Sequence, residues 1–192
     1  TLTTGISDTS IDEDATTLSL SATFADVDVG DTLTYTMSGH PSSLSIDSST
    51  GAITGTPVNA DVGAHTITVT ATDDSSAAAS ASDVFVLTVV NTNDAPTVTS
   101  ALADASTDED AAYSLDVSSM CTDVDVGDSL AYTMSGAPST LSISSGSISG
   151  TPLNADVATH TITVTCTDDS SAAASASDSF DLTVANTNDA PT

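Results

Sequence analysis

The side chains of this sequence best suited to chemistry are carboxylates, and they recur at matched positions. The chain has only two glutamates, Glu13 in "IDEDA" and Glu109 in "STDEDA". Most aspartates also fall in blocks that occur twice, such as "DVDVGD", which begins at Asp26 and again at Asp123. Ordinary solvated surface charge is the alternative, but it gives no reason for two glutamates to share one equivalent position. We therefore interpret the repeated carboxylates as ligands for a cation.

The overall charge makes a bound cation more plausible. The 192 residues include 27 acidic side chains and no Lys or Arg, which gives a formal net charge of −27. Self-repulsion on this scale opposes a compact state, and no Lys or Arg is present to form salt bridges. Salt or bound cations must therefore neutralise the carboxylates. Such a surface is a poor partner for nucleic acid or an anionic membrane.

The elements that would position these carboxylates come in two copies. "DVDVGDTLTYTMSG" at 26–39 returns as "DVDVGDSLAYTMSG" at 123–136, and the block at 55–83 returns at 150–178. A period this long indicates tandem domains rather than a solenoid of short units. We place the boundary after Pro96, which gives modules at 1–96 and 97–192.

Alternation of apolar residues with Thr and Ser predicts short strands within each copy. In the first copy we expect strands near 16–24, 32–37, 43–46, 52–54, 65–72 and 83–90, and another near the N-terminus. About seven strands in a module of this length predict an all-β chain of two tandem seven-stranded antiparallel immunoglobulin-like sandwiches. The low-complexity stretches at 75–82 and 170–177 are expected to be loops.

Strand ends and loops of a sandwich gather at two poles, which predicts where the ligands lie. We expect one group at the C-terminal pole of the first module and another at the facing N-terminal pole of the second module. Neutral amide oxygens add to both groups. The predicted ligands are Glu13, Asn59, Asp61, Asn91, Asn93 and Asp94 for the first group and linker, and Asp123, Asp125 and Asp168 for the second.

Ca²⁺ is the cation that suits these ligands best. It takes about 6–8 oxygen ligands from carboxylates, amides and backbone carbonyls. No thiolate or histidine cluster lies near the predicted ligands, which argues against zinc and copper. Mg²⁺ is less suitable because it prefers a compact octahedron and retains its waters. Two or three Ca²⁺ ions would balance the six carboxylates that we place around the linker.

Four motifs together resemble the cadherin family. "NTNDAP", at 91–96 and 186–191, resembles the cadherin linker D-x-N-D-N-A-P, with Asn91 in place of its first Asp and one Asn missing before Ala95. "DVD" at 26–28 and 123–125 matches D-x-D, and "TATDD" and "TCTDD" resemble A-x-D. "TGAITGTPVNAD" parallels T-G-x-I followed by P-L-D-R-E. Over nearly its whole length, the chain resembles tandem cadherin-like modules of the dystroglycan type found in bacterial surface and secreted proteins.

The resemblance implies a mechanical use of the ions. In the family, calcium sits between successive modules and stiffens the rod. By this likeness Asp73 and Asp168 are ligands, Asn59 and Asp61 replace the Asp and Glu of the family motif, and Glu13 and Glu109 match the glutamate near the end of the first strand.

The cysteines offer a separate expectation. Cys121 and Cys166 occur only in the second copy, where Phe24 and Ala71 are their equivalents in the first. A large and small pair replaced by two middle-sized residues suggests that the two positions touch across the sandwich. We expect a disulfide, which would agree with an extracellular location. The alternative is two buried thiols that act as small hydrophobic side chains.

These observations predict a structural rather than a catalytic protein. No nucleophile–base pair is visible, and His65, His160 and His40 are interpreted as structural or exposed. The sequence contains no apolar run of about 18 residues, so we expect no transmembrane helix. We predict calcium-stiffened extender repeats of a large extracellular bacterial adhesin, secreted or on the cell surface, monomeric, with neighbouring repeats as partners. The alternative is a calcium-dependent module that binds a glycan or a protein.

Overall fold

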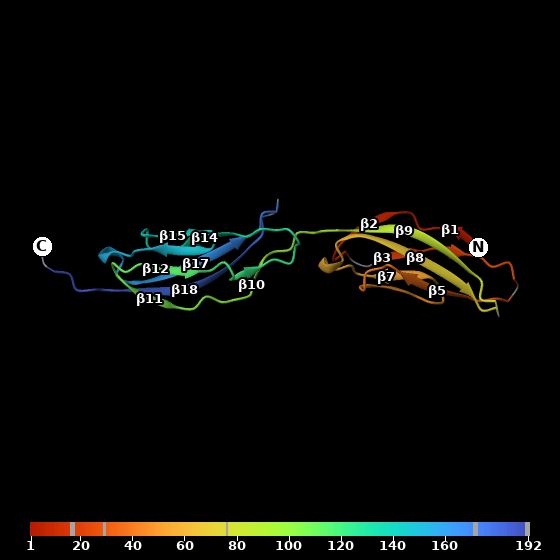
Figure 1. Ribbon diagram of the computed structural model, residues 1–192, viewed down its shortest axis with the longest axis horizontal. Coiled ribbons are helices and arrows are strands. Elements are labelled where there is room, and N and C mark those ends of the chain that lie inside the picture. Colours follow the sequence, from red (N-terminus) through yellow and green to blue (C-terminus); the bar gives the residue numbers. More distant parts are fainter. Residues whose placement is uncertain (16–17, 29, 76, 171–172, 191–192) are drawn as a thin grey trace. The chain divides into compact units, whose positions relative to one another are not determined.

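The computed structural model describes residues 1–15, 18–28, 30–75, 77–170 and 173–190. It divides into two compact units, Thr1–Thr92 and Asn93–Thr192. Both are built almost wholly from β-strands, as Figure 1 shows. The expected all-β fold of two tandem β-sandwiches is therefore confirmed. Among the described residues, no helix is long and apolar enough to cross a membrane.

The first unit packs a four-stranded sheet, in the order β2-β9-β8-β5, on a three-stranded sheet, in the order β3-β7-β6. A short pair, β1-β4, lies beside them. The strands are β1 (Leu2–Thr4), β2 (Thr9–Asp12), β3 (Leu18–Ser21), β4 (Thr23–Phe24), β5 (Leu33–Ser38), β6 (Leu44–Ile46), β7 (Ala52–Gly55), β8 (Gly63–Asp73) and β9 (Ser80–Val90).

The second unit repeats this topology strand for strand. Its sheets have the orders β11-β18-β17-β14 and β12-β16-β15, with the short pair β10-β13. The strands are β10 (Thr97–Val98), β11 (Ala105–Asp108), β12 (Tyr113–Asp116), β13 (Cys121–Thr122), β14 (Ala131–Ser135), β15 (Leu141–Ser144), β16 (Ser147–Gly150), β17 (Thr159–Thr167) and β18 (Ser175–Ala185).

Alternating side chains of the long strands fill each core. In β8, Ile67, Val69 and Ala71 are buried and the threonines between them are partly exposed. Threonine and β-branched residues suit a half-buried pleated surface, so both faces of β8 favour the strand. Ile162 and Val164 take the same places in β17 and are fully buried. Truncating such an isoleucine to alanine typically costs about 2–5 kcal/mol.

The expectation of purely antiparallel sheets is wrong at one edge of each unit. β2 pairs parallel to β9, with Thr9 opposite Leu87, and β11 pairs parallel to β18. The cause is that the first strand changes sheets. β1 pairs antiparallel to β4, and the chain then crosses so that β2 lies beside β9 and runs in the same direction.

Aspartates support this crossover. Asp83 Oδ2 accepts the backbone N–H of Ile6 at 2.6 Å, and Asp8 Oδ1 accepts that of Val86 at 2.8 Å. Asp178 and Asp104 make the equivalent bonds in the second unit, at 2.7 and 2.9 Å. Four of the repeated carboxylates therefore hold an edge strand in place rather than face a pole.

The low-complexity stretches are only partly loops, contrary to expectation. β9 already begins at Ser80 and β18 at Ser175. The small alternating residues pair in register with β8, and Ser82 Oγ lies 2.9 Å from Thr70 Oγ1. Ser76, Ser171 and Ala172 of these stretches lie outside the described residues.

Cys121 and Cys166 form a disulfide that joins β13 to β17, which confirms the expectation. Both cysteines are buried in the core of the second unit. In the first unit Phe24 packs its ring edge-on against Tyr35, with ring centroids 6.0 Å apart. A cross-link across 45 residues stabilises a fold by roughly 4 kcal/mol in the chain-entropy model.

Candidate metal centre

The C-terminal pole of the second unit contains a buried glutamate, Glu109. Glu109 is 2% exposed, and its Oε1 accepts the backbone N–H of Thr187 at 2.8 Å. Its Oε2 is buried with no hydrogen-bond partner among the described residues. Oxygens of Asp110 and Asp189 lie with an oxygen of Glu109 in one group within 4.8 Å. A buried carboxylate oxygen without a partner is costly, so this group fits a cation.

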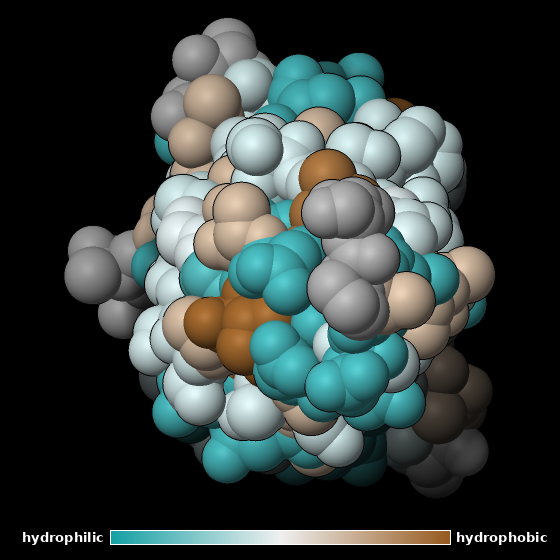
Figure 2. Space-filling model, turned by 90° about the vertical axis from the view of Figure 1, so that its left-hand side faces the viewer, coloured by the Kyte–Doolittle hydropathy of each residue, from teal (hydrophilic) through white to brown (hydrophobic). Residues whose placement is uncertain are grey.

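The molecular face at this pole is polar. Figure 2 looks onto the end that carries the C-terminus in Figure 1, and this face is mostly teal to pale, with hydrophobic atoms only in small separate areas. Asp110 and Asp189 are both exposed. An ion held by Glu109 would therefore be reached from solvent.

Glu13 occupies the same position in the first unit. It is 2% exposed, and its backbone N–H donates to the carbonyl of Val90 at 3.0 Å. Its Oε1 accepts the N–H of Thr92 at 2.9 Å, and its Oε2 is also buried without a hydrogen-bond partner among the described residues. Asn91, a predicted ligand, lies beside Thr92 in the chain and is exposed.

Asp61 has a structural role that the sequence does not predict. Its Oδ2 accepts the N–H of Val58 at 3.0 Å and the hydroxyl of Ser43 at 2.5 Å, which fastens the short 3-10 turn Asn59–Asp61. Asp156 repeats these bonds with Leu153 and Thr140. The N–H of Leu153 is the main cause that lowers the pKa of Asp156. Asn59, another predicted ligand, begins the turn and is partly exposed.

The N-terminal pole of the second unit gathers three carboxylates. Oxygens of Asp123, Asp128 and Asp168 all lie within 4.8 Å of one another. Asp168 is 4% exposed, and one oxygen each of Asp123 and Asp128 is buried without a hydrogen-bond partner among the described residues. Asp125, which is 5% exposed, follows Asp123 and donates its N–H to that carboxylate at 3.0 Å.

Two linker residues reach the same pole of the second unit. The side-chain amide of Asn93 donates to Asp168 Oδ2 at 3.2 Å, and the N–H of Asp94 donates to Asp125 Oδ2 at 2.8 Å. Both linker residues group with the second unit, whereas the sequence analysis assigned Asp94 to the pole of the first module. The structure therefore brings together Asn93, Asp94, Asp123, Asp125 and Asp168 of the predicted set.

The charges at this pole shift the pKa values in opposite directions. Desolvation and then the neighbouring Asp169 raise the pKa of Asp128 above its ordinary value. The hydroxyl of Ser170 is the main cause that lowers the pKa of Asp168. Asp168 therefore favours its ionised form, while Asp128 carries a penalty for its charge that a bound cation would remove.

The N-terminal pole of the first unit has a related but more open group. Oxygens of Asp26, Asp28 and Asp31 lie within 4.8 Å of one another. Asp26 and Asp28 are exposed. Desolvation, followed by the charge of Asp74, raises the pKa of Asp31.

The ligand chemistry of these groups suits a hard cation. All the atoms that these groups bring together are carboxylate oxygens, as Ca²⁺ prefers. The cysteine sulfurs are used in the disulfide. The ring nitrogens of His65 and His160 lie 2.7 Å from the carbonyl oxygens of Asp61 and Asp156, so these histidines are structural.

The predicted ligands did not include several members of these groups, among them Asp128 and Asp110. Asp128 joins Asp123 and Asp168, and Asp110 joins Glu109. The signal for Asp128 was present, because the third aspartate of "DVDVGD" recurs at 31 and 128. Asp110 gives a weaker signal, because Asp14 repeats it in a stretch that also reads as an ordinary acidic turn.

Two β-sandwiches of one topology, each with carboxylates at its poles, define a tandem immunoglobulin-like or cadherin-like repeat protein. The family described as "Putative Ig domain" matches residues 2–90 and 95–185. The chain belongs to this family, with one domain in each unit.

Known proteins agree with this class. The chain is 39% identical over 140 residues to a "Serine-rich adhesin for platelets" of Staphylococcus aureus strain MRSA252, a match that covers 71% of the chain and 10% of that protein. The chain thus spans a small part of its relative.

Solved cadherin structures share the fold. Mouse cadherin-23 EC22-24 superposes with a TM-score of 0.65 at 19% identity, covering 96% of this chain and 63% of that one. Drosophila N-cadherin EC1-4 gives a TM-score of 0.62 at 20% identity, covering 96% and 48%. At these identities the likeness shows the fold alone.

Proposed function

We propose that the chain is a pair of calcium-stiffened extender repeats from a large extracellular adhesin, secreted or on the cell surface. In this proposal Ca²⁺ binds where one module joins the next, and the partners of each module are its neighbouring repeats. The match to a bacterial adhesin supports the parent class. The disulfide supports an oxidising compartment.

The observation that carries the proposal is the buried Oε2 of Glu109, which has no hydrogen-bond partner in the part of the chain that the structure describes, as is also true of Glu13. No Lys or Arg exists in the sequence to neutralise either glutamate. Glu109 is also tied by Oε1 to Thr187, at the start of the second "NTNDAP" segment. The same carboxylate can therefore fix the linker with one oxygen and bind an ion with the other.

The linker supports a position for the ion at the join between modules. Glu13 binds Thr92, while the next two residues, Asn93 and Asp94, bond to carboxylates of the second unit. One stretch of "NTNDAP" thus contacts acidic side chains of both repeats. Ligands that come from two modules and from the linker would make calcium binding restrict the bending of the joint.

The mechanism is linkage between binding and folding. An ion that binds the folded, aligned pair and not the unfolded or splayed pair stabilises the former by about 2.7 kcal/mol at a hundredfold excess over its Kd. Without the ion, the carboxylates repel one another. The joint then loosens, and the units become less stable.

Thermal unfolding with and without EGTA tests this proposal. We expect the melting temperature to rise with calcium concentration and to fall on chelation, with NaCl at matched ionic strength as the control for simple screening. Identical melting curves in millimolar calcium and in EGTA would contradict the proposal.

A further inference from the structure

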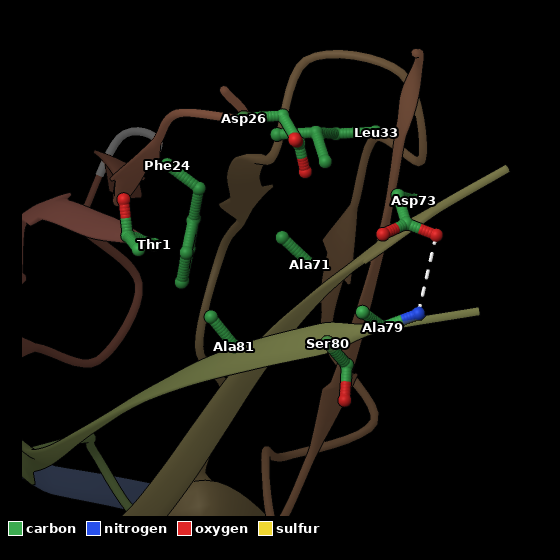
Figure 3. Close-up of a pocket in the computed structure, with 9 residues that line it drawn as sticks. All are labelled: Thr1, Phe24, Asp26, Leu33, Ala71, Asp73, Ala79, Ser80 and Ala81. Atoms are coloured by element: carbon green, nitrogen blue, oxygen red, sulfur yellow. Dashed lines mark hydrogen bonds between the residues drawn. The ribbon is translucent and has the colours of Figure 1, made fainter. Parts of the chain in front are cut away.

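A pocket of about 230 Å³ opens at the N-terminal pole of the first unit. Figure 3 shows Phe24 on one side of it, Asp73 on the opposite side, Asp26 at the top, and Ala71 and Ala81 between them. The whole lining consists of Thr1, Phe24, Asp26, Leu33, Ala71, Asp73, Ala79, Ser80 and Ala81. An apolar interior with a carboxylate rim suits a small apolar group that is joined to polar neighbours.

The second unit shows which residue belongs at this place. Thr97 pairs with Thr122 in β10-β13. Thr1 makes the matching pair with Ala25, because its amino group donates to the Ala25 carbonyl at 2.6 Å and its own carbonyl accepts the Ala25 N–H at 2.8 Å. Thr1 therefore corresponds to Thr97, and the residue that precedes Thr97 is Pro96.

Pro96 is buried in the second unit, although Ala95 and Thr97 on either side of it are exposed. Continuing the β10-β13 register by one residue places Pro96 opposite Asp123. Asp123 corresponds to Asp26, which lines the pocket of the first unit. Proline has no N–H to donate, but the first position of an edge strand needs no ladder donor, so no hydrogen bond is lost there. The position in front of Thr1 therefore suits a proline.

The polar residues of the linker also have matching acceptors in the first unit. Asn93 donates to Asp168 and the N–H of Asp94 donates to Asp125 in the second unit. Asp73 and Asp28 are the equivalents of those acceptors by sequence. The hydrogen bonds described for Asp73 come from Ser75 and Ala79 and end on Oδ1, as those of Ser170 to Asp168 do.

We propose that this pocket receives the proline of another Asn-Thr-Asn-Asp-Ala-Pro segment, the linker of a further module joined ahead of the first unit. The inference rests on the proposed function for the idea that modules repeat, but it does not require calcium. In this arrangement Asn meets Asp73, the backbone of the following Asp meets Asp28, and the proline ring packs beside Phe24.

The test adds Asn-Thr-Asn-Asp-Ala-Pro ahead of Thr1 of the full chain and compares it with the same extension ending in Gly. NMR should show nuclear Overhauser effects between the added proline ring and the Phe24 ring. The proline chain should also melt at a higher temperature in its first unit than the glycine chain. Both chains are measured in calcium and in EGTA.

A second variant makes the pocket smaller. Ala81→Leu fills the interior, so it should abolish the Overhauser effects to Phe24 while the backbone shifts of β8 and β9 stay close to those of the parent. An added proline with random-coil shifts and no contact to Phe24, in calcium and in EGTA, would overturn the proposal. So would contacts between Pro191 and Phe24 in the unextended chain that grow with concentration, since these would assign the pocket to a second copy. Calcium titration of the unextended chain reports on the proposed function separately.

Discussion

Glu109 accepts the N–H of Thr187 on Oε1 at 2.8 Å and keeps its other oxygen buried without a hydrogen-bond partner among the described residues. The relation between Glu13 and Thr92 is the same, at 2.9 Å. Each glutamate therefore holds the backbone at the start of a linker and offers one oxygen for a further ligand. In a chain without Lys or Arg, no such side chain can neutralise that oxygen.

The two glutamates form a matched pair for mutation. In the two-module chain only Glu13 is followed by a complete second unit, so Glu13→Gln should weaken the tightest calcium binding at least tenfold, or about 1.4 kcal/mol. Glu109→Gln should change that binding by less than threefold, although Glu109 matches Glu13 in burial and in its hydrogen bond to the linker backbone. Isothermal titration calorimetry measures both variants. Equal effects of the two substitutions would argue against a site at the join.

The effect of Asp128→Asn on the melting temperature should have opposite signs in EGTA and in calcium. Desolvation and nearby carboxylates raise the pKa of Asp128, so the folded state binds a proton more tightly than the unfolded state. The ionised group therefore destabilises the fold at neutral pH, and this penalty fades as the pH falls through the raised pKa. The substitution should raise the melting temperature in EGTA and lower calcium affinity. Lower stability of this variant in EGTA would count against the penalty that we assign to the ionised Asp128.

The disulfide should stabilise the second unit against unfolding and leave the first unit unaffected. Replacing both Cys121 and Cys166 by alanine should cost that unit about 2–5 kcal/mol. The first unit, with Phe24 and Ala71 at these positions, provides the internal control. Differential scanning calorimetry should show only the transition of the second unit moving down. A shift of both transitions by the same amount would show that the two units unfold together.

Calcium affinity should also respond to the disulfide. Each cysteine lies two residues before a predicted ligand, Cys121 before Asp123 and Cys166 before Asp168. The bond therefore fixes the ends of the two strands that directly precede these carboxylates. The double alanine variant should bind calcium more weakly, and unchanged affinity would show that the backbone alone positions the ligands.

Asp47 should make a pH-dependent contribution to the stability of the first unit. The N–H of Thr50 is the main cause that lowers its pKa below the ordinary 3.8, and Ser49 adds a second bond. A lowered pKa means that the carboxylate stabilises the fold above the ordinary value and that this stability is lost as the pH falls through the folded pKa. Carbon-13 NMR titration should give a midpoint below 3.8. A midpoint at or above the ordinary value would contradict the hydrogen bonds.

Much of the fold could be predicted from the sequence, because apolar residues alternate regularly with polar ones along the strands. Ile67, Val69 and Ala71 alternate with threonine, which predicts β8 and its buried face. The disulfide was predictable for a similar reason, since Phe24 and Ala71 in one copy and two cysteines in the other fill the same space. The repeat therefore supplied an internal comparison.

The role of each carboxylate could not be predicted, because it depends on which distant residues the fold brings next to it. Nothing in the local sequence separates Asp83, which binds the N–H of Ile6 at the crossover, from an aspartate at a pole. Asp61 looks like a ligand in its motif, yet its Oδ2 fastens a turn to Val58 and Ser43. Hydrogen bonds across many residues decide the role of each carboxylate, and the residue type alone does not specify them.

The central claim is that divalent ions restrict the joint between the modules. Small-angle X-ray scattering of the full chain, in millimolar calcium and again in EGTA at equal ionic strength, measures this most directly. The account predicts a narrower range of maximum dimensions with calcium and a broader, more flexible ensemble after chelation. Superimposable scattering curves in the two conditions would contradict it.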